Sequence, residues 1–245
     1  MSEPTFDAEN LFDDDYLYFF ADHLDARSDA EADLVWRLLD LRPGMDVLDL
    51  ACGHGRISNR IAQRGCRVTG LDSSRVFLER ARQDAEALGV AVDYVHGDMR
   101  RLPWTGRFDR VVSWFTAFGY FSDCDNQRVL AQAAATLRPG GKIAIDLNNY
   151  AAVARTYQRS TVVERDGDLV VDRHHLDLLT SRNIVDRTII RDGRTRKVPF
   201  FARMFTFTEL RGWMLAAGFT TVQAVGADGA ELTIDSRRMI VVAER

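Results

Sequence analysis

The stretch VLDLACGHG, residues 47–55, decides the fold that this sequence predicts. Its apolar half predicts a buried strand that ends near Ala51. Gly53 and Gly55 then allow the backbone to turn tightly and to approach a ligand without a Cβ in the way. The helix pattern that follows at 56–65 would direct its amino end at the same ligand. The stretch therefore predicts a strand, a ligand-binding turn and a helix.

Strand and helix patterns alternate through the residues that follow. We expect strands at 46–51, 67–72, 92–98, 108–114 and 142–147, and helices at 56–65, 74–89 and 126–141. This alternation predicts a mainly parallel sheet with helices on both faces. Such sheets bind ligands beyond the carboxyl ends of their strands. Residues 1–45 read as a helical segment that covers this site, so we divide the chain into 1–45 and 46–245.

The pattern changes after residue 150. Residues 160–206 alternate polar and apolar side chains around the turn sequences RDGD and RDGR, which predicts an antiparallel β insertion. An insertion at this place can reach over the binding edge as a lid. The elements expected after it are a helix at 207–219, capped by Thr208 and ended by Gly218, and two antiparallel strands at 220–227 and 231–244.

Composition and charge argue against several classes of protein. The chain has 245 residues, of which 46% are hydrophobic and 28% charged, as in an ordinary globular domain. Its net charge of −4 and pI near 5.8 give no basic field for nucleic acid. No apolar run approaches the ~18 residues of a membrane span, and the acidic amino terminus has no signal-peptide pattern. Three scattered cysteines, Cys52, Cys66 and Cys124, indicate a reducing compartment and no metal cluster, so we expect a cytoplasmic protein.

Acidic residues at the strand ends narrow the choice of cofactor. Asp72 ends the second strand, where a carboxylate can accept hydrogen bonds from both hydroxyls of a ribose, as in a dinucleotide or S-adenosylmethionine. Ser58 replaces the third glycine of the dinucleotide fingerprint. Asp49 precedes the turn, where a carboxylate suits a sulfonium or an α-ammonium better than a pyrophosphate. Asp98 can accept from an adenine amino group or be only a turn acid, and Met99 can pack on the ring.

Six segments resemble one known family in both order and spacing. They are VLDLACGHG, VTGLD, GDMRRLP, FDRVVSWFTAFGYF, LRPGGKIAIDL and FTELRGWMLAAGF. From about residue 30 to the C-terminus the chain resembles the class I S-adenosylmethionine-dependent methyltransferases. The resemblance implies a Rossmann-like α/β fold, with a seven-stranded, mainly parallel sheet, an antiparallel last strand and helices on both faces.

The resemblance also implies a cofactor site. In such enzymes the glycine turn holds the methionine part of S-adenosylmethionine, the acid that corresponds to Asp72 holds the ribose, and the acid that corresponds to Asp98 binds adenine. Trp114 would face the methionine part or the sulfonium. S-adenosylhomocysteine would be the product, and we expect no metal. The expected cofactor residues are Asp49, Ala51, Gly53, Gly55, Asp72, Ser73, Gly97, Asp98, Met99 and Trp114.

Aromatic residues beyond the strand ends are candidates for the site of the methyl acceptor. The reaction would be an in-line attack by a lone pair of the acceptor, in a site that aligns the reactants and excludes water. Phe118 and Tyr120 follow the fourth strand and are expected to face the reacting methyl group. Tyr16 can bind the cofactor carboxylate or orient an amine. His174 and its neighbour His175 would face opposite sides of a strand, so His174 is a candidate general base or a residue that only packs in the lid.

The overall pattern resembles small-molecule N-methyltransferases of bacterial secondary metabolism. The sequence lacks the Asn-Pro-Pro-Tyr type of motif found in enzymes that methylate DNA bases, and the paired glutamates of protein arginine methyltransferases. We therefore expect a small-molecule acceptor that is methylated on an amine nitrogen, and no nucleic-acid or membrane partner. The alternatives are O-methylation and a non-catalytic module that only binds S-adenosylmethionine, whereas a dehydrogenase would bind NAD. An insertion of this kind can also build a homodimer.

Overall fold

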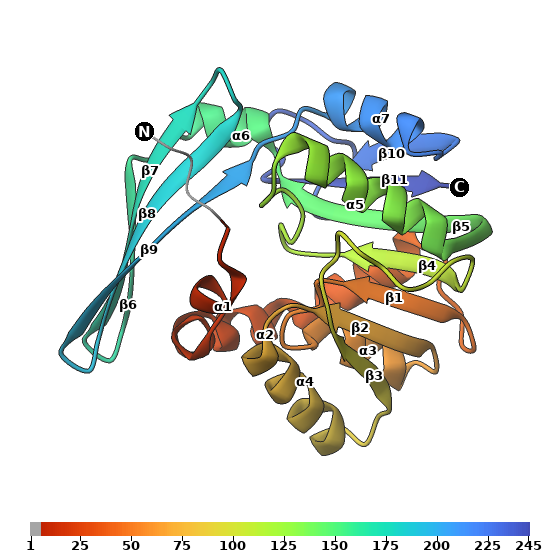
Figure 1. Cartoon of the computed structure of the whole chain (residues 1–245), viewed down its shortest axis with the longest axis horizontal. Helices are drawn as coiled ribbons and strands as arrows, with labels where there is room; N and C mark the ends of the chain where they lie inside the picture. The colour runs from red at the N-terminus through yellow and green to blue at the C-terminus, as the bar shows by residue number, and fades with distance from the viewer. Residues whose placement is uncertain (1–5) are drawn as a thin grey trace.

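The structure is a computed structural model that describes residues 6–245. Within these residues the chain forms a seven-stranded sheet and a four-stranded sheet (Figure 1). The strands of the larger sheet are β1 (Asp46–Leu50), β2 (Arg67–Asp72), β3 (Val92–His96), β4 (Phe108–Ser113), β5 (Leu137–Asn148), β10 (Thr221–Val225) and β11 (Arg238–Glu244). The helices are α1 (Ala8–Leu11), α2 (Asp14–Leu38), α3 (Arg56–Gln63), α4 (Arg75–Ala87), α5 (Asp123–Thr136), α6 (Tyr150–Arg155) and α7 (Phe207–Ala216). None of these helices of residues 6–245 is long and apolar enough to cross a membrane.

Strand directions in the larger sheet confirm the predicted fold class. The strand order is β10-β11-β5-β4-β1-β2-β3. β1 pairs in parallel with β2 and β4, and the pairs β2–β3 and β4–β5 are parallel as well. β11 runs antiparallel to both of its neighbours, β5 and β10. The sheet is therefore Rossmann-like and mainly parallel, with an antiparallel last strand.

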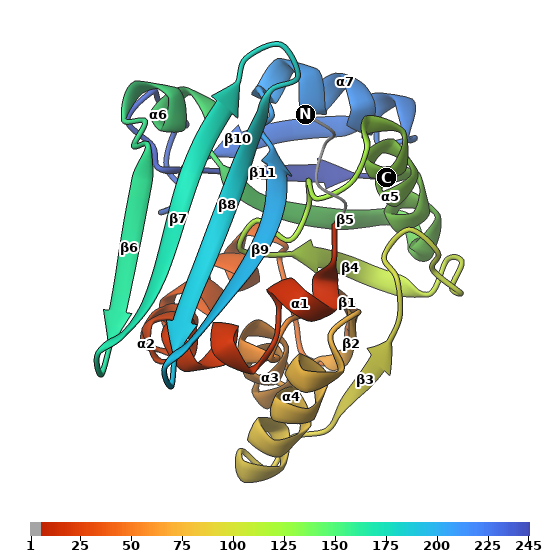
Figure 2. The same cartoon turned by 60° about the vertical axis from the view of Figure 1, so that its left-hand side comes forward.

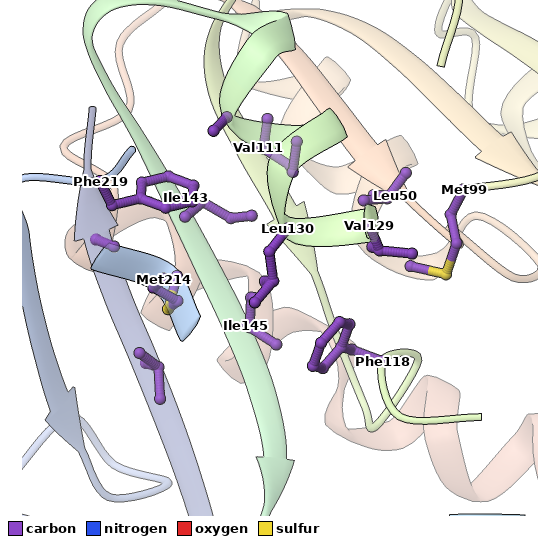
Figure 3. Close-up of a cluster of buried hydrophobic side chains, with 14 of the residues drawn as sticks. Leu50, Met99, Val111, Phe118, Val129, Leu130, Ile143, Ile145, Met214 and Phe219 are labelled. Atoms are coloured by element: carbon purple, nitrogen blue, oxygen red, sulfur yellow. The ribbon is translucent and has the colours of Figure 1, made fainter. Parts of the chain in front are cut away.

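Apolar residues on both sides of each central strand explain why helices cover both faces of this sheet. In β1, Val47 packs in a cluster with α2 and α3, whereas Leu48 packs in the opposite cluster with α5 and α7. In β5, Ala144 and Ile145 divide between the two clusters in the same way. Figure 3 shows the second cluster, where Leu130 of α5 lies beside Ile145. The carboxyl ends of the parallel strands are left as the open edge of the sheet.

Three boundaries of elements differ from the prediction. α5 ends before 141, because Pro139 disfavours the helical conformation at the residue that precedes it. The cap of α7 is Thr206, whose side chain accepts a hydrogen bond from the Glu209 N–H, and Thr208 lies inside the helix. β11 begins at Arg238 and not at 231, because side-chain hydrogen bonds hold a turn before it.

The smaller sheet is antiparallel throughout. Its strands are β6 (Ser160–Arg165), β7 (Asp168–Asp177), β8 (Arg182–Arg191) and β9 (Arg194–Arg203). The sequences RDGD and RDGR form the turns of its first and last hairpins, which confirms the turns predicted there. Figures 1 and 2 show this sheet standing beyond the carboxyl ends of the parallel strands, with α1 and α2 beside it.

The amino-terminal helices pack against the inner face of the smaller sheet. Leu11 and Phe19 form a hydrophobic cluster with Val170, Ile189 and Val198, which come from β7, β8 and β9. The two segments are far apart in the sequence, yet together they face the open edge of the larger sheet.

Opposite charges join the same two segments. Asp13 and Asp15, at the start of α2, both bind Arg196 of β9. Asp15 also binds Arg191 of β8, with an N–O distance of 3.0 Å. The acidic run near the amino terminus is therefore paired with the basic residues around the last hairpin turn.

Candidate active site

A cavity of about 990 Å³ lies between the two sheets. One wall is formed by residues at or just after the carboxyl ends of β1, β2, β3 and β4, including Asp49, Asp72, Asp98 and Trp114. The opposite wall is the inner face of β7, β8 and β9, and residues of α1 and α2 also line the space. A volume of this size is typical of sites for small molecules.

Most of the residues expected at the site line this cavity. From the cofactor set these are Asp49, Ala51, Gly53, Asp72, Ser73, Gly97, Asp98, Met99 and Trp114, and from the acceptor set Tyr16, Tyr120 and His174. Gly55 and Phe118 do not line it. The structure brings the other side chains together, and their individual roles stay predictions.

The two glycines of the turn lack a side chain for different reasons. Gly53 has φ +57°, and its N–H donates to the Asp72 carboxylate at 2.8 Å on the cavity wall. Gly55 has φ +77°, and a Cβ there would overlap the Tyr94 hydroxyl and crowd Ala81. Gly55 was expected beside the cofactor. Its position corrects that expectation, because the missing side chain lets α3 pack closely on its neighbours.

Asp72 is fixed by backbone hydrogen bonds from two loops. Its Oδ2 accepts from the Gly53 N–H and its Oδ1 from the Ser74 N–H, both at 2.8 Å. Ser74 caps α4, since its hydroxyl accepts from the Phe77 N–H, and the adjacent Ser73 lines the cavity. Burial raises the pKa of Asp72. Each carboxylate oxygen keeps a further lone pair, so this side chain can accept two more hydrogen bonds from a ligand.

Asp49 is a buried acid next to the glycine turn. Its carboxylate accepts a hydrogen bond from the Ser58 hydroxyl at 2.6 Å, which gives a structural reason for the serine at the place of the third glycine. Burial raises the pKa of Asp49 to about 6, although the Ser58 hydrogen bond and the charge of Arg56 oppose the rise. A positively charged group in the cavity would therefore favour the ionised carboxylate.

Asp98 is paired with a cation that sequence reasoning missed. Arg100 donates from Nε to both carboxylate oxygens at 3.0 Å and from Nη2 to Oδ2 at 2.6 Å. Burial raises the pKa of Asp98, but these hydrogen bonds outweigh it and hold the pKa below its usual value. The Arg100 guanidinium also lies 4.5 Å from the centre of the Phe121 ring. The carboxylate is thus ionised and oriented by Arg100 at the cavity wall.

The loop after β4 places two residues other than glycine in the left-handed region. Phe115 and Thr116 both have φ +59°. Asp146 supports this conformation, because its Oδ2 accepts from the Phe115 N–H at 2.9 Å while its two oxygens bind Arg238 at 2.8 and 2.7 Å. Such conformations cost roughly 1–3 kcal/mol each and gather at functional sites. All four residues belong to, or directly support, the cavity wall.

Phe118 belongs to the core and not to the cavity. Its side chain is 1% exposed and stacks on Phe205, with ring centroids 5.3 Å apart. Figure 3 shows it in the hydrophobic cluster with Leu130 and Ile145. The expectation that Phe118 faces the reacting group is corrected accordingly. Its neighbour Tyr120 is the residue of this loop that lines the cavity.

Two buried tyrosines form the aromatic end of the cavity. Burial raises the pKa of both Tyr16 and Tyr120, so both hydroxyls stay protonated at neutral pH and can donate hydrogen bonds. Neither hydroxyl is hydrogen-bonded to another of the residues 6–245, so both are available to a ligand. The rings packed around them are Phe6, Phe12, Phe20, Phe77 and Phe200.

An ion pair on the smaller sheet lines the same end. Arg187 of β8 donates from Nε and Nη2 to the two carboxylate oxygens of Asp172 on β7, each at 2.8 Å. Both residues are 9% exposed, and the guanidinium lies over the rings of Phe20 and Phe200. Sequence reasoning missed the pair. A charged residue between two apolar residues on the inward face of an alternating strand was the available indication.

His174 is held by two other side chains. Its Nε2 lies 3.2 Å from the Thr161 hydroxyl, and its Nδ1 lies 3.2 Å from the Asn183 side-chain nitrogen. Neither ring nitrogen can accept a proton from a methyl acceptor without losing one of these partners. The other amide atom of Asn183, its Oδ1, is buried without a partner among the described residues, and Asn183 lines the cavity. Asn183, rather than His174, therefore has a free polar atom for a ligand.

Comparison with known proteins places this geometry in a family. A model described as a methyltransferase domain matches residues 47–141. The cypemycin N-terminal methyltransferase of a Streptomyces species is 29% identical over 212 residues, which cover 82% of this chain and 84% of that protein. The structure of the CcbJ methyltransferase from Streptomyces caelestis is 25% identical, with a TM-score of 0.74 over 89% of this chain and 91% of that one. The chain belongs to the class I S-adenosylmethionine-dependent methyltransferases.

Other relatives match this methyltransferase over different shares of their length. The putative methyltransferase YqeM of Bacillus subtilis is 31% identical over 125 residues, and the match spans 50% of each chain, about half the length of that relative. The structure of CalS10 from Micromonospora echinaspora, described as an amino pentose methyltransferase with bound S-adenosylmethionine, is 25% identical with a TM-score of 0.66. It covers 93% of this chain and 98% of that one. S-adenosylmethionine is the cofactor of this methyltransferase.

The cavity residues fit that cofactor. Asp72 has two acceptor lone pairs free in the cavity, as two ribose hydroxyls require. A Cβ at Gly53 would project into open space at the cavity wall, 3.7 Å from the Phe77 ring, so the glycine leaves room for a ligand. A buried Nη2 of Arg56 also has no partner among residues 6–245, as expected for a group that awaits an anion.

Proposed function

We propose that this methyltransferase transfers the methyl group of S-adenosylmethionine to an amine nitrogen of a small molecule. The observation that carries the proposal is the single cavity of about 990 Å³, which runs from the strand ends of the larger sheet to the aromatic inner face of the smaller one. Such a space fits a cofactor at one end and a small acceptor at the other. The bound cofactor supplies an electrophilic methyl group on a sulfonium, and methyl transfer leaves S-adenosylhomocysteine.

In this proposal the strand ends hold the cofactor. Asp72 accepts from the ribose hydroxyls, and Asp98 accepts from the adenine amino group while Met99 packs on the ring. Asp49 faces the positively charged methionine part, and Trp114 packs beside it. The indole N–H of Trp114 is already fixed, since it donates to Glu31 at 2.9 Å, so its ring has a set orientation.

The other end of the cavity would position the acceptor. Tyr16 and Tyr120 offer hydroxyl donors, and Asn183 Oδ1 offers an acceptor for an N–H or O–H of the substrate. The surrounding aromatic faces stabilise the positive charge that appears on nitrogen as the methyl group arrives. Alignment of two reactants in such a site can lower a barrier by roughly 7–11 kcal/mol in favourable cases, without a covalent intermediate.

Two observations favour nitrogen over oxygen as the acceptor atom. The printed names of the cypemycin N-terminal methyltransferase and of a glycine/sarcosine N-methyltransferase from Parasynechococcus marenigrum, 31% identical over 148 residues, both state methylation on nitrogen. A hydroxyl acceptor has to lose a proton to a base, whereas a neutral amine already carries a lone pair. His174 is bound at both ring nitrogens, so it suits an acceptor that needs no such base.

Paired acceptors test this proposal. The purified chain with S-adenosylmethionine should produce S-adenosylhomocysteine when small amines are added, including amino sugars and amino-acid esters, and mass spectrometry should find the new methyl group on nitrogen. The matched control for each amine is the alcohol that carries a hydroxyl in its place. Turnover of the alcohols alone would replace the proposal by O-methylation. Tight cofactor binding without turnover of any acceptor would favour a non-catalytic binding module.

The buried Asp49 predicts a pH dependence of cofactor binding. Burial raises its pKa to about 6, so the carboxyl group is increasingly protonated below that pH. The positive charges of the cofactor favour the ionised form, so binding releases a proton, and affinity should rise between about pH 5 and about pH 7 and then level off. Calorimetry over this range measures the change.

Asp49→Asn is the control for this prediction. The substituted amide keeps an oxygen that can accept from the Ser58 hydroxyl, but it has no charge to titrate. The variant should bind the cofactor more weakly and lose the rise in affinity. An equal rise in the variant and the natural protein would assign the pH dependence to another group.

A further inference from the structure

Arg56 has an unusual position for a cation. It is the first residue of α3, directly after the glycine turn, and it lines the cavity. Its side chain is 6% exposed. Its Nη1 lies 2.6 Å from a Glu31 oxygen and 3.3 Å from the Ser28 hydroxyl. Its Nη2 is buried and has no partner among the residues that the structure describes. An unpaired buried donor on a charged group is strongly unfavourable, so this atom calls for a ligand.

The charges around Arg56 show what kind of ligand fits. The guanidinium groups of Arg27, Arg56 and Arg238 lie 5.7, 5.4 and 5.3 Å from the centre of the Phe115 ring. Two carboxylates are paired with them: Glu31 binds Arg27 and Arg56, and Asp146 binds Arg238. The three cations therefore face only two such anions, which leaves room for one more negative group at the ring.

Asp49 is the remaining acid near Arg56. The charge of Arg56 acts on Asp49, yet the hydrogen bond that Asp49 accepts comes from Ser58 and not from the guanidinium. The two side chains thus present separate negative and positive groups to the cavity beside the glycine turn. A zwitterion with adjacent ammonium and carboxylate groups is the complementary ligand.

We propose that Arg56 Nη2 binds the α-carboxylate of the cofactor's methionine part, while Asp49 faces its α-ammonium. The ligand chemistry is an amino-acid zwitterion, and the carboxylate is the anionic group of S-adenosylmethionine. The two cavity-facing charges then lie on the same side of the glycine turn as the amino-acid end of the cofactor. The inference rests on the identity of the cofactor and requires no particular acceptor.

Glu31 is the positioning residue for this contact. It comes from α2 and binds Arg27 at 2.7 Å, Arg56 at 2.6 Å and the Trp114 indole N–H at 2.9 Å. With Nη1 held by Glu31, the planar guanidinium has a fixed orientation and Nη2 is directed away from that carboxylate. The docking of α2 therefore sets both Arg56 and Trp114 before the cofactor binds.

Calorimetry with two ligands tests the inference. The ligands are S-adenosylmethionine and decarboxylated S-adenosylmethionine, which keeps the sulfonium and the amine but lacks the carboxylate. Arg56→Met should weaken binding of the first ligand by about ten- to a hundredfold, the range for a lost hydrogen bond to a charged group, and leave the second within about twofold. In the natural protein the decarboxylated ligand should already be weaker by a similar factor. Arg64→Gln, at the far end of α3 with its ion pair to the exposed Asp33, is the control and should change neither affinity.

Each other outcome overturns the assignment. Equal losses for both ligands in Arg56→Met would make Arg56 a purely structural residue, and no loss for either would place the carboxylate elsewhere. Glu31→Gln should cause a smaller loss that is again selective for the ligand with a carboxylate, which a general defect in folding would not produce. If Arg56→Met does not fold, Arg56→Lys keeps the charge but not the fork. It should then show a selective loss for S-adenosylmethionine, and an unselective one would contradict the proposal.

Discussion

Replacing Asp72 with alanine is expected to weaken the binding of S-adenosylmethionine by about 2–4 kcal/mol, roughly 30- to 900-fold. The variant loses the carboxylate that we propose for the ribose hydroxyls. It also leaves the N–H groups of Gly53 and Ser74 without their acceptor at the cavity wall. Titration calorimetry with S-adenosylmethionine measures the effect directly.

Asp93→Ala is the matched control for this variant. Asp93 lies on the adjacent strand β3, its side chain is 62% exposed, and its contact with Arg107 is loose at 3.9 Å. The control should bind the cofactor as the natural protein does. If Asp72→Ala keeps full affinity, the ribose assignment fails. If both variants lose affinity and Tm together, the loss reports damage to the sheet and not to the site.

The second large effect is expected at the ion pair between Asp172 and Arg187. Asp172→Leu should lower the free energy of unfolding by about 3–5 kcal/mol, because it leaves a buried guanidinium without its partner. The double variant Asp172→Leu/Arg187→Met should recover most of this loss, since two apolar side chains replace the pair inside a largely apolar cluster. Urea unfolding followed by circular dichroism measures both.

An exposed ion pair on the same sheet provides the comparison. Asp22, with a side chain 75% exposed, binds Arg165 at 2.8 Å, and Asp22→Asn should change stability by less than about 1 kcal/mol. A similarly small effect in Asp172→Leu would show that the cavity solvates Arg187 well without Asp172. The double variant should still bind S-adenosylmethionine, because its substitutions are in the smaller sheet. It should lose acceptor turnover if Arg187 lines the acceptor end, as we propose.

Features encoded by neighbours in the sequence were predictable. The strand, turn and helix around Gly53 follow from a local pattern, and the strand ends then place Asp49, Asp72 and Asp98 at one edge by topology alone. The sequence also contained the departure at Ser58. Only the structure shows its use, because the hydroxyl donates to a carboxylate from the preceding strand.

Roles that depend on distant partners were not predictable. Gly55 is needed because Tyr94 packs against it, and Phe118 turns into the core because Phe205 provides a ring to stack on. His174 is occupied by Thr161 and Asn183, which lie on two other strands of the smaller sheet. A pattern within one segment carries no information about which side chain another segment will bring. The residues near each motif were foreseen, and their partners were not.

The pairing of Asp13 and Asp15 with Arg191 and Arg196 has a consequence for how this enzyme can diverge. The wall that faces the substrate is inherited as two pieces of chain from opposite ends of the gene, matched to each other by charge and by apolar contacts. A chimera that imports β6 to β9 from a relative but keeps its own amino terminus would bring mismatched halves together. Exchange of both pieces at once is the route by which one scaffold can acquire a new selectivity without disturbing its nucleoside grip.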